Sequence, residues 1–220
     1  MTKRLGIIPA GGQAERFNGV YKELLPISQE ECGLTRCIAA MLNGEADKIV
    51  IATNPRKFKR LQEAVKGIPN VQFYVKDFHG VWEVLADIGD IPAERYFFGM
   101  PDTIFPLDVF KDAPNNDVVI GEFHTKKTNR FGVLWDGHIL DKRDLPLNGG
   151  YPAWGTWNWS SDAMKFLVRS ARRYRNHTPA MESTMQRFGS VSVFMPFYFD
   201  FACFEDYKEF LCNPTLNNME

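Results

Sequence analysis

The sequence has no excess of charge of either sign. Its 26 lysines and arginines nearly balance 27 aspartates and glutamates, which leaves a formal net charge of −1. Proteins that hold nucleic acid backbones or anionic membranes usually carry a strong positive field. We therefore expect no nucleic acid and no membrane among the partners, and the balance favours a small-molecule substrate.

Long apolar runs are also missing. Lys3 and Arg4 make the N-terminus basic, but the apolar run after them ends at Pro9. That run is too short for the core of a signal peptide, and no other stretch approaches a membrane span. We expect a cytoplasmic protein.

Cysteine and histidine are scarce, with four of each. The cysteines form no C-x-x-C pair and the histidines stand singly, which argues against a zinc site. Reduced thiols in the cytosol are the simplest interpretation of the cysteines.

Apolar residues are plentiful, at 45% of 220 positions, which is enough for a full core in one large domain or two small ones. In the first half, short apolar runs alternate with helical patterns. The predicted strands are residues 5–8, 48–52, 71–75, 95–99 and 118–122. The predicted helices are residues 34–42, 55–65 with Asn54 as cap, 81–88, and a short helix from Leu107. This alternation implies right-handed crossovers and a mostly parallel sheet covered on both faces.

From about Phe123 the pattern changes to shorter pieces that are typical of antiparallel strands. The predicted strands are residues 131–135, 138–140, 153–159, 191–195 and 198–201. The predicted helices are residues 162–174, 181–188 and 204–211. Trp154, Trp157 and Trp159 fall in one of these strands, where they either line a ligand pocket or pack in the core.

Two loops of unusual chemistry follow predicted parallel strands. One spans residues 10–21, and the other is Met100-Pro101-Asp102-Thr103. Ligands of parallel α/β sheets lie beyond the carboxyl ends of the strands, so we expect these loops to be neighbours at a binding site.

The first loop suits a polyphosphate. Gly11 and Gly12 let the backbone amides approach phosphate oxygens, while Arg16 and Lys22 supply fixed positive charge. The segment is neither a Walker motif nor a dinucleotide fingerprint. The full pattern is more specific than a glycine pair alone. It consists of a strand, a glycine pair, an arginine, a lysine and then Leu24-Leu25-Pro26-Ile27.

This segment, which runs from Pro9-Ala10-Gly11-Gly12 to Lys22-Glu23-Leu24-Leu25-Pro26, resembles the sugar-phosphate nucleotidyltransferase family of the glucose-1-phosphate thymidylyltransferase type. The signature of that family is roughly L-A-G-G-x-G-T-R…K-x-L-L-P. The resemblance implies that the nucleotide binds at Ala10, Gly11, Gly12, Arg16 and Lys22, with Arg16 and Lys22 also acting in catalysis.

Further segments carry the resemblance across most of the chain. Phe98-Gly99-Met100-Pro101-Asp102-Thr103 looks like the family's L-G-D-x-I-F, which makes Asp102 a catalytic, magnesium-binding aspartate. Phe199-Asp200-Phe201-Ala202-Cys203 resembles D-x-G-T, which makes Asp200 the second metal ligand. His79-Gly80-Val81-Trp82 stands where the family has a glycine at its base pocket, which implies a nucleotide contact for Gly80.

The acceptor side is implied by weaker matches. Asn129-Arg130-Phe131-Gly132-Val133 is similar to R-Y-G-V, which puts Gly132 beside the sugar. Asp141-Lys142-Arg143 stands in place of E-K-P, which implies that Lys142 binds the sugar phosphate, and Tyr151 is a further candidate for sugar contact.

The implied fold is α/β: a single-domain, Rossmann-like nucleotidyltransferase fold of the glycosyltransferase-A-like kind, with a mixed, mostly parallel central sheet. Residues 1–122 form the nucleotide-binding half and residues 123–220 the acceptor half. The implied reaction transfers a nucleoside monophosphate from a nucleoside triphosphate to a sugar 1-phosphate, with Mg²⁺ as cofactor and pyrophosphate as product. The sequence leaves the base, the acceptor and a homo-oligomeric state open.

Several alternatives stand beside this interpretation. Asp102 could cap a following helix, Asp200 could fix a turn, and Lys142 could belong to a solvated charge cluster. Ala14 and Glu15 replace a family glycine and threonine, and the Arg16-to-Lys22 spacing is closer to cytidylyl- and guanylyltransferases. The acceptor could therefore be a non-sugar phosphate, or the chain could be an inactive nucleotide or sugar sensor. A glycosyltransferase is less favoured because no clear D-x-D motif is found.

Overall fold

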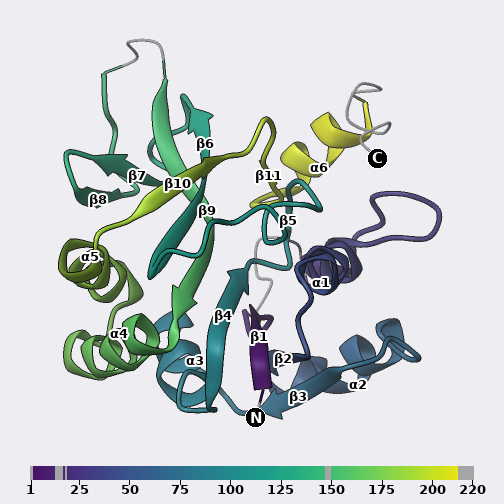
Figure 1. Ribbon diagram of the computed structural model, residues 1–220. Helices are drawn as coiled ribbons and strands as arrows, with labels where there is room; N and C mark the ends of the chain where they lie inside the picture. Colours follow the sequence, from purple (N-terminus) through teal and green to yellow (C-terminus); the bar gives the residue numbers. More distant parts are fainter. Residues whose placement is uncertain (1, 13–16, 18, 147–149, 213–220) are drawn as a thin grey trace.

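The computed structural model describes residues 2–12, 17, 19–146 and 150–212. In this part of the chain, one sheet of nine strands forms the centre of the molecule, with the order β10-β6-β9-β4-β1-β2-β3 and with β7 and β8 at its side (Figure 1). Its strands are β1 (Thr2–Pro9), β2 (Lys48–Thr53), β3 (Val71–Val75), β4 (Ala93–Gly99), β6 (Val118–Thr125), β7 (Gly132–Trp135), β8 (His138–Asp141), β9 (Tyr151–Ser160) and β10 (Val191–Phe194). A separate two-stranded sheet pairs β5 (Thr103–Ile104) with β11 (Phe199–Asp200).

The central sheet is mixed but mostly parallel, as the sequence predicts. Strand β1 runs parallel to both β2 and β4, β2 to β3, and β10 to β6, whereas β9 runs antiparallel to β4 and β6. Leu5, Ile7 and Ile8 of β1 are fully buried, because helices cover both faces of a parallel sheet. The chain therefore has an α/β, Rossmann-like architecture.

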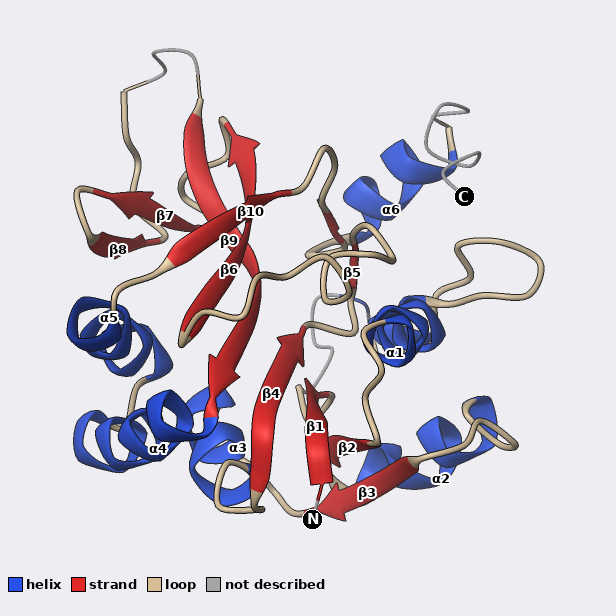
Figure 2. Ribbon diagram, in the orientation of Figure 1, coloured by secondary structure: helices blue, strands red, loops and turns tan. Residues whose placement is uncertain are grey.

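Helices pack on the two faces of the sheet (Figure 2). Helices α1 and α2 bury Leu34, Met41 and Leu61 against one face, and α3, α4 and α5 bury Leu85 and Leu167, among others, against the opposite face. The helices are η2 (Lys22–Leu24, a 3₁₀ turn), α1 (Gly33–Asn43), α2 (Pro55–Ala64), α3 (Val81–Ile88), α4 (Ser161–Tyr174), α5 (His177–Phe188) and α6 (Phe204–Leu211). None of the helices in the described ranges is long and apolar enough to cross a membrane.

The predicted short helix from Leu107 is wrong. Residues 107–111 form successive turns between β5 and β6. The bonds there are mixed, since Val109 N donates to Pro106 O and Asp112 N donates to Asp108 O. Val109 and Phe110 are buried in the core, so tertiary packing holds this segment without a regular helical ladder.

A bulge in β9 decides on which face Trp154 lies. The register with β6 shifts so that Thr156 faces Gly121 while Trp154 faces Glu122, which leaves Gly155 as the extra residue. Trp157 and Trp159, two residues apart, share one face of β9 and are buried in the core with rings stacked 5.7 Å apart. The extra residue brings Trp154 to the same face, where it packs against the same cluster. Core packing is thus the correct alternative for Trp157 and Trp159.

A small apolar cluster joins the C-terminal helix α6 to the segment after β1. It consists of Phe17, Leu25, Ile104, Phe201, Tyr207 and Phe210. The Tyr207 hydroxyl also donates a hydrogen bond to Pro26 O at 2.7 Å. Residues far apart in the sequence therefore hold the segment that follows Lys22.

Candidate functional site

A cleft of about 1150 Å³ opens at the carboxyl edge of the parallel strands. Four successive strand ends contribute to its lining, with Gly12 after β1, Asn54 after β2, His79 after β3 and Asp102 after β4. The two loops expected to be neighbours therefore share this cleft. Another hollow, of about 730 Å³, lies at the opposite edge among Arg4, Asp47, Arg95 and other polar residues, and it contains none of the predicted site residues among those described.

The glycine loop is held from beneath by the backbone and by the end of β2. Ala10 N donates to Ala52 O at 2.7 Å, and Asn54 Nδ2 donates to Gly11 O at 2.9 Å. A Cβ atom added at Gly12 would meet no atom of the described residues within 4 Å. Protein packing therefore does not require glycine at this position, and the open side leaves its backbone accessible to a ligand in the cleft.

Lys22 lies in η2 and forms an ion pair with Asp102. The Lys22 side chain is 28% exposed and that of Asp102 only 8%, so the pair lies at the inner end of the cleft. Burial lowers the pKa of Lys22, but the carboxylates of Asp102, Asp200 and Glu23 together raise it above its ordinary value. Lys22 is therefore a fixed ammonium group at neutral pH.

Asp200 is brought to Asp102 by the two-stranded sheet. Asp200 of β11 pairs with Thr103 of β5, and Phe201 N donates to Asp102 O at 3.0 Å. Burial and the neighbouring charge of Asp102 raise the pKa of Asp200, although Arg130 and Lys22 act in the opposite direction. The helix-cap alternative for Asp102 is wrong, because a strand follows this residue.

Arg130 is a charged partner of the site to which the sequence assigned no role. Its guanidinium donates to Asp200 Oδ2 at 2.8 Å and to Asp206 Oδ1 at 2.6 Å. Burial lowers the pKa of Arg130 and the two carboxylates raise it, with a net increase. Arg130 belongs to the segment that resembles R-Y-G-V, but its partners are 70 and 76 residues away, and no local pattern predicts such contacts.

The carboxylates at the inner end of the cleft are the groups that could hold a metal ion. Among the described residues, no group of three aspartate, glutamate, histidine or cysteine side chains is arranged to hold a metal ion. Asp102 and Asp200 supply two neighbouring carboxylates. Mg²⁺ usually takes one or two protein carboxylates and completes its octahedron with water and substrate phosphates, so these two residues fit it.

The loop around Gly80 is fixed by Glu83. Glu83 Oε2 accepts a bond from His79 N at 2.8 Å and lies 3.0 Å from His79 Nδ1. Glu83 Oε1 lies 2.5 Å from Lys76 Nζ. The backbone bond from His79, followed by the bond from Lys76, lowers the pKa of Glu83 to about 2. A permanent carboxylate thus holds the loop in which Gly80 lines the cleft.

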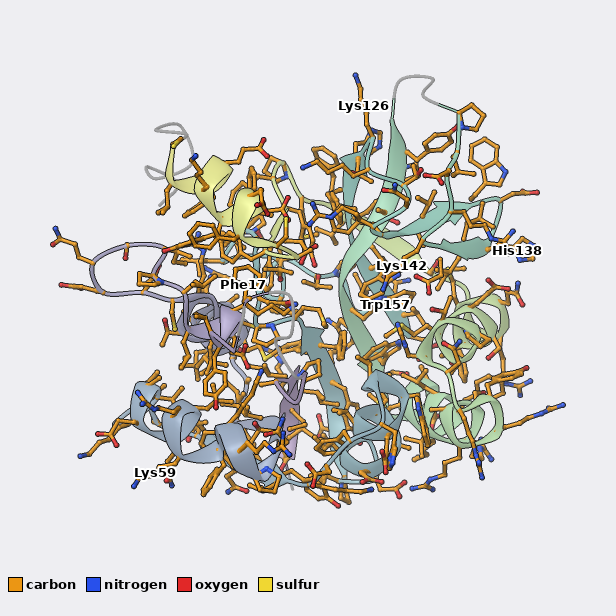
Figure 3. All side chains as sticks on the ribbon, turned by 180° about the vertical axis from the view of Figure 1, so that it is seen from behind. Phe17, Lys59, Lys126, His138, Lys142 and Trp157 are labelled. Atoms are coloured by element: carbon orange, nitrogen blue, oxygen red, sulfur yellow. The ribbon has the colours of Figure 1, made fainter. Side chains whose placement is uncertain are left out.

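The predicted acceptor residues are not among the described residues that line the cleft. Gly132 lies in β7 against Trp154, whose Nε1 would be 2.2 Å from an added Cβ, so close packing accounts for this glycine. The Tyr151 hydroxyl donates a hydrogen bond to Pro146 O, and its ring lies tilted against Trp135, with the ring centroids 5.6 Å apart. Lys142 follows β8 and is exposed, and Figure 3 shows it nearer the middle of the molecule than His138. Arg16, Ala14 and Glu15 lie outside the described residues.

No protein-family model matches the sequence, and no curated protein matches it either. Its structure, by contrast, is similar to that of 512 chains of solved structures, so the fold is common and does not by itself identify a function. One is the crystal structure of a protein from Bacillus anthracis, assigned as a glucose-1-phosphate thymidylyltransferase, in complex with sucrose. The two structures superpose with a TM-score of 0.81 over 99% of this chain and 96% of the other, at 17% sequence identity. This likeness shows that the two proteins share a fold.

Proposed function

We propose that this protein is a nucleotidyltransferase that transfers a nucleoside monophosphate from a nucleoside triphosphate to a sugar 1-phosphate and releases pyrophosphate. The observation that supports the proposal is the meeting of the glycine loop, Lys22, Gly80 and Asp102 in one cleft at the carboxyl edge of the sheet. The likeness to a protein assigned as a glucose-1-phosphate thymidylyltransferase favours a sugar 1-phosphate as acceptor.

The nucleotide binds in the half formed by residues 1–122 in this proposal. The backbone amides of Gly11 and Gly12 donate hydrogen bonds to phosphate oxygens, and Lys22, joined by Arg16, offsets the charge of the β- and γ-phosphates. The base is proposed to lie against Gly80, in the loop that Glu83 holds. Lys22 and this loop are held by protein contacts before the substrate arrives, which is the main requirement for electrostatic stabilisation.

Asp102 and Asp200 would hold Mg²⁺. When bound, this ion supplies positive charge that stabilises the transferred phosphoryl group and the leaving pyrophosphate. Lys22 beside Asp102 adds a second positive charge on the same side of the cleft.

Residues 123–220 bind the acceptor in this proposal, with Lys142 at its phosphate and Gly132 and Tyr151 near the sugar. An oxygen of the acceptor phosphate attacks the α-phosphorus, the bond between the α-phosphorus and the bridging oxygen breaks, and pyrophosphate leaves. The acceptor oxygen is already anionic at neutral pH, so no general base is needed. The work of the protein is alignment and charge stabilisation.

The test measures pyrophosphate release from the full chain with Mg²⁺, each of the common nucleoside triphosphates, and a panel of sugar 1-phosphates and phosphorylated alcohols. We expect release with one nucleotide and a sugar 1-phosphate. Release of pyrophosphate only with a phosphorylated alcohol would instead indicate a nucleotidyltransferase of the cytidylyltransferase type. Calorimetric titration of each nucleotide measures binding separately from turnover.

A nucleotide-binding protein without turnover is a second candidate. The observation that favours it is that both carboxylates already have a protein cation, since Lys22 pairs with Asp102 and Arg130 with Asp200. Nucleotide binding in the calorimeter without pyrophosphate release for any acceptor would select this candidate over the enzyme.

A further inference from the structure

A buried ion pair lies at the edge of the cleft, next to Lys22. Lys57 Nζ is 2.5 Å from Glu23 Oε1, and the two side chains are only 3% and 2% exposed. Both residues contribute to the cleft lining. The Tyr21 ring lies 5.2 Å from Lys57 Nζ and covers the pair, while its hydroxyl donates to Arg56 O at 3.3 Å.

The position of Lys57 is unfavourable for the helix that carries it. Asn54 caps α2 through Oδ1, which accepts from Lys57 N at 3.0 Å, so Lys57 is the third residue of the first turn. Cations are disfavoured at this end of a helix because the macrodipole is positive there. Burial of an ammonium group is also costly unless it is paired. The reason for a buried lysine at this position therefore lies outside α2.

Glu23 connects Lys57 to the catalytic lysine. Glu23 is the middle residue of η2, the 3₁₀ turn that begins with Lys22. Its carbonyl oxygen lies next to Gly33 of α1, where an added Cβ would be 3.7 Å away. Because the turn has only three residues, the contact between Lys57 and the Glu23 carboxylate fixes the orientation of the whole turn.

The same end of α2 also holds the glycine loop. Asn54, which caps the helix, donates through Nδ2 to Gly11 O at 2.9 Å. The start of α2 thus contacts both segments that would bind the triphosphate. Asn54 contacts Gly11, and Lys57 contacts Glu23.

We propose that Lys57 is a positioning residue which, through Glu23, fixes the turn that carries Lys22 and so directs Lys22 toward Asp102. Its consequence for turnover rests on the proposed nucleotidyl transfer, whereas its consequence for the placement of Lys22 does not. Lys57 itself touches no reacting atom in this arrangement.

The test that needs no activity is acetylation footprinting of the full chain, read by mass spectrometry. The variant Glu23→Gln/Lys57→Met removes both charges together, which avoids an unpaired buried charge. We expect Lys22 to react several times faster in this variant, because its ammonium group is no longer directed at Asp102. Lys59, which points away from the molecule on the same helix in Figure 3, is the internal control and should react at an unchanged rate. Unchanged reactivity of Lys22 would overturn the proposal.

Glu23→Gln alone is the second variant, in case the double variant does not fold. This change keeps the shape of the Glu23 side chain but removes the charge that pairs with Lys57 Nζ. Circular dichroism and thermal unfolding confirm the folded state before footprinting, and the same increase in Lys22 reactivity is expected.

A double-mutant cycle tests the consequence for turnover. We expect kcat to fall at least about tenfold in Glu23→Gln/Lys57→Met, since a small displacement of a catalytic group costs up to about 100-fold. In a Lys22→Ala background the same pair of changes should cause no further loss. Equal losses in both backgrounds would show that the pair does not act through Lys22. A wild-type protein without turnover would contradict the proposed function, while the footprint would still decide the role of Lys57.

Discussion

The cleft at the carboxyl ends of β1 to β4 and the hairpin of β7 and β8 differ in how their charged side chains are surrounded. In the cleft, Asp102, Glu23 and Lys57 are buried, and each has a protein partner at contact distance. In the hairpin region, Asp141 and Lys142 are exposed, and His138 at the outer end meets Glu182 across the surface. One region is organised before any ligand binds, and the other has room to adjust.

The difference suggests a division of labour. Groups that are fixed in a protein of low dielectric stabilise charge in a transition state without reorganisation, so they affect kcat most. Exposed groups lose side-chain entropy when they bind and are screened by water, so they affect affinity more than rate. The cleft is therefore the better candidate for chemistry, and the hairpin for acceptor selection.

The largest expected effect tests whether the cleft depends on its buried charges. Lys57→Met leaves the Glu23 carboxylate buried without a partner, so we expect the free energy of unfolding to fall by about 3–5 kcal/mol. The matched control is Lys59→Met on the exposed side of the same helix, which should change it by less than about 0.5 kcal/mol. Urea titration of both variants measures the difference, and equal midpoints would contradict the division between the regions.

The second effect concerns rate. Asp102→Asn keeps the shape of the side chain but removes the charge next to Lys22, so we expect kcat for pyrophosphate release to fall by roughly 10²–10³. The control is Asp112→Asn, an exposed carboxylate in the turns after β5, which should retain wild-type turnover. Because both changes preserve side-chain shape, a comparable loss in the two variants would remove Asp102 from the proposed site.

The sequence predicts the first half of the fold well because each strand there has its own local sequence pattern. Strand β2, predicted at residues 48–52, is Lys48–Thr53, and α2 begins at the predicted proline with Asn54 as its cap. A strand buried on both faces reads as a continuous apolar run, and a capped helix start has its own pattern. The positions of the glycine loop and of Asp102 then follow from topology, since parallel strands end at one edge.

What could not be predicted depends on contacts between distant residues. Strand β11 lies within the predicted strand at residues 198–201, but β5 has only two residues, too few for a periodic pattern, and it is the pairing of these two strands that brings Asp200 to Asp102. Lys57 and Glu23 are 34 residues apart, and no spacing rule connects a helix start to a 3₁₀ turn. The bulge at Gly155 likewise brings Trp154 to the same face as Trp157 and Trp159, which alternation alone would not do.

The third effect sharpens the other side of the comparison. If Lys142 binds the acceptor phosphate from an exposed position, Lys142→Ala should raise the KM for the acceptor about tenfold and leave kcat nearly unchanged, since one charge-assisted bond is lost in both ground and transition states. Lys126→Ala, at another exposed lysine of this half, is the control (Figure 3). A fall in kcat with an unchanged KM would place Lys142 in the chemistry and blur the distinction between the regions.

The smallest expected effect is the pH dependence of the loop at Gly80. The bonds from His79 and Lys76 lower the pKa of Glu83 to about 2, below the ordinary value of 4.5, and Asp87 also pairs with Lys76. A carboxylate whose folded pKa is depressed stabilises the protein above its unfolded pKa, and this stabilisation is lost as the pH falls from about 4.5 toward 2. We expect Glu83→Gln to lower Tm at pH 7 by about 2–4 °C, the change that a contribution of about 1 kcal/mol gives in a chain of this size. The difference from the wild type should shrink as the pH falls through that window, because the protonated glutamic acid then resembles glutamine. A difference that stays constant down to pH values near 2 would mean that the shape of the side chain, and not its charge, holds the loop against the cleft.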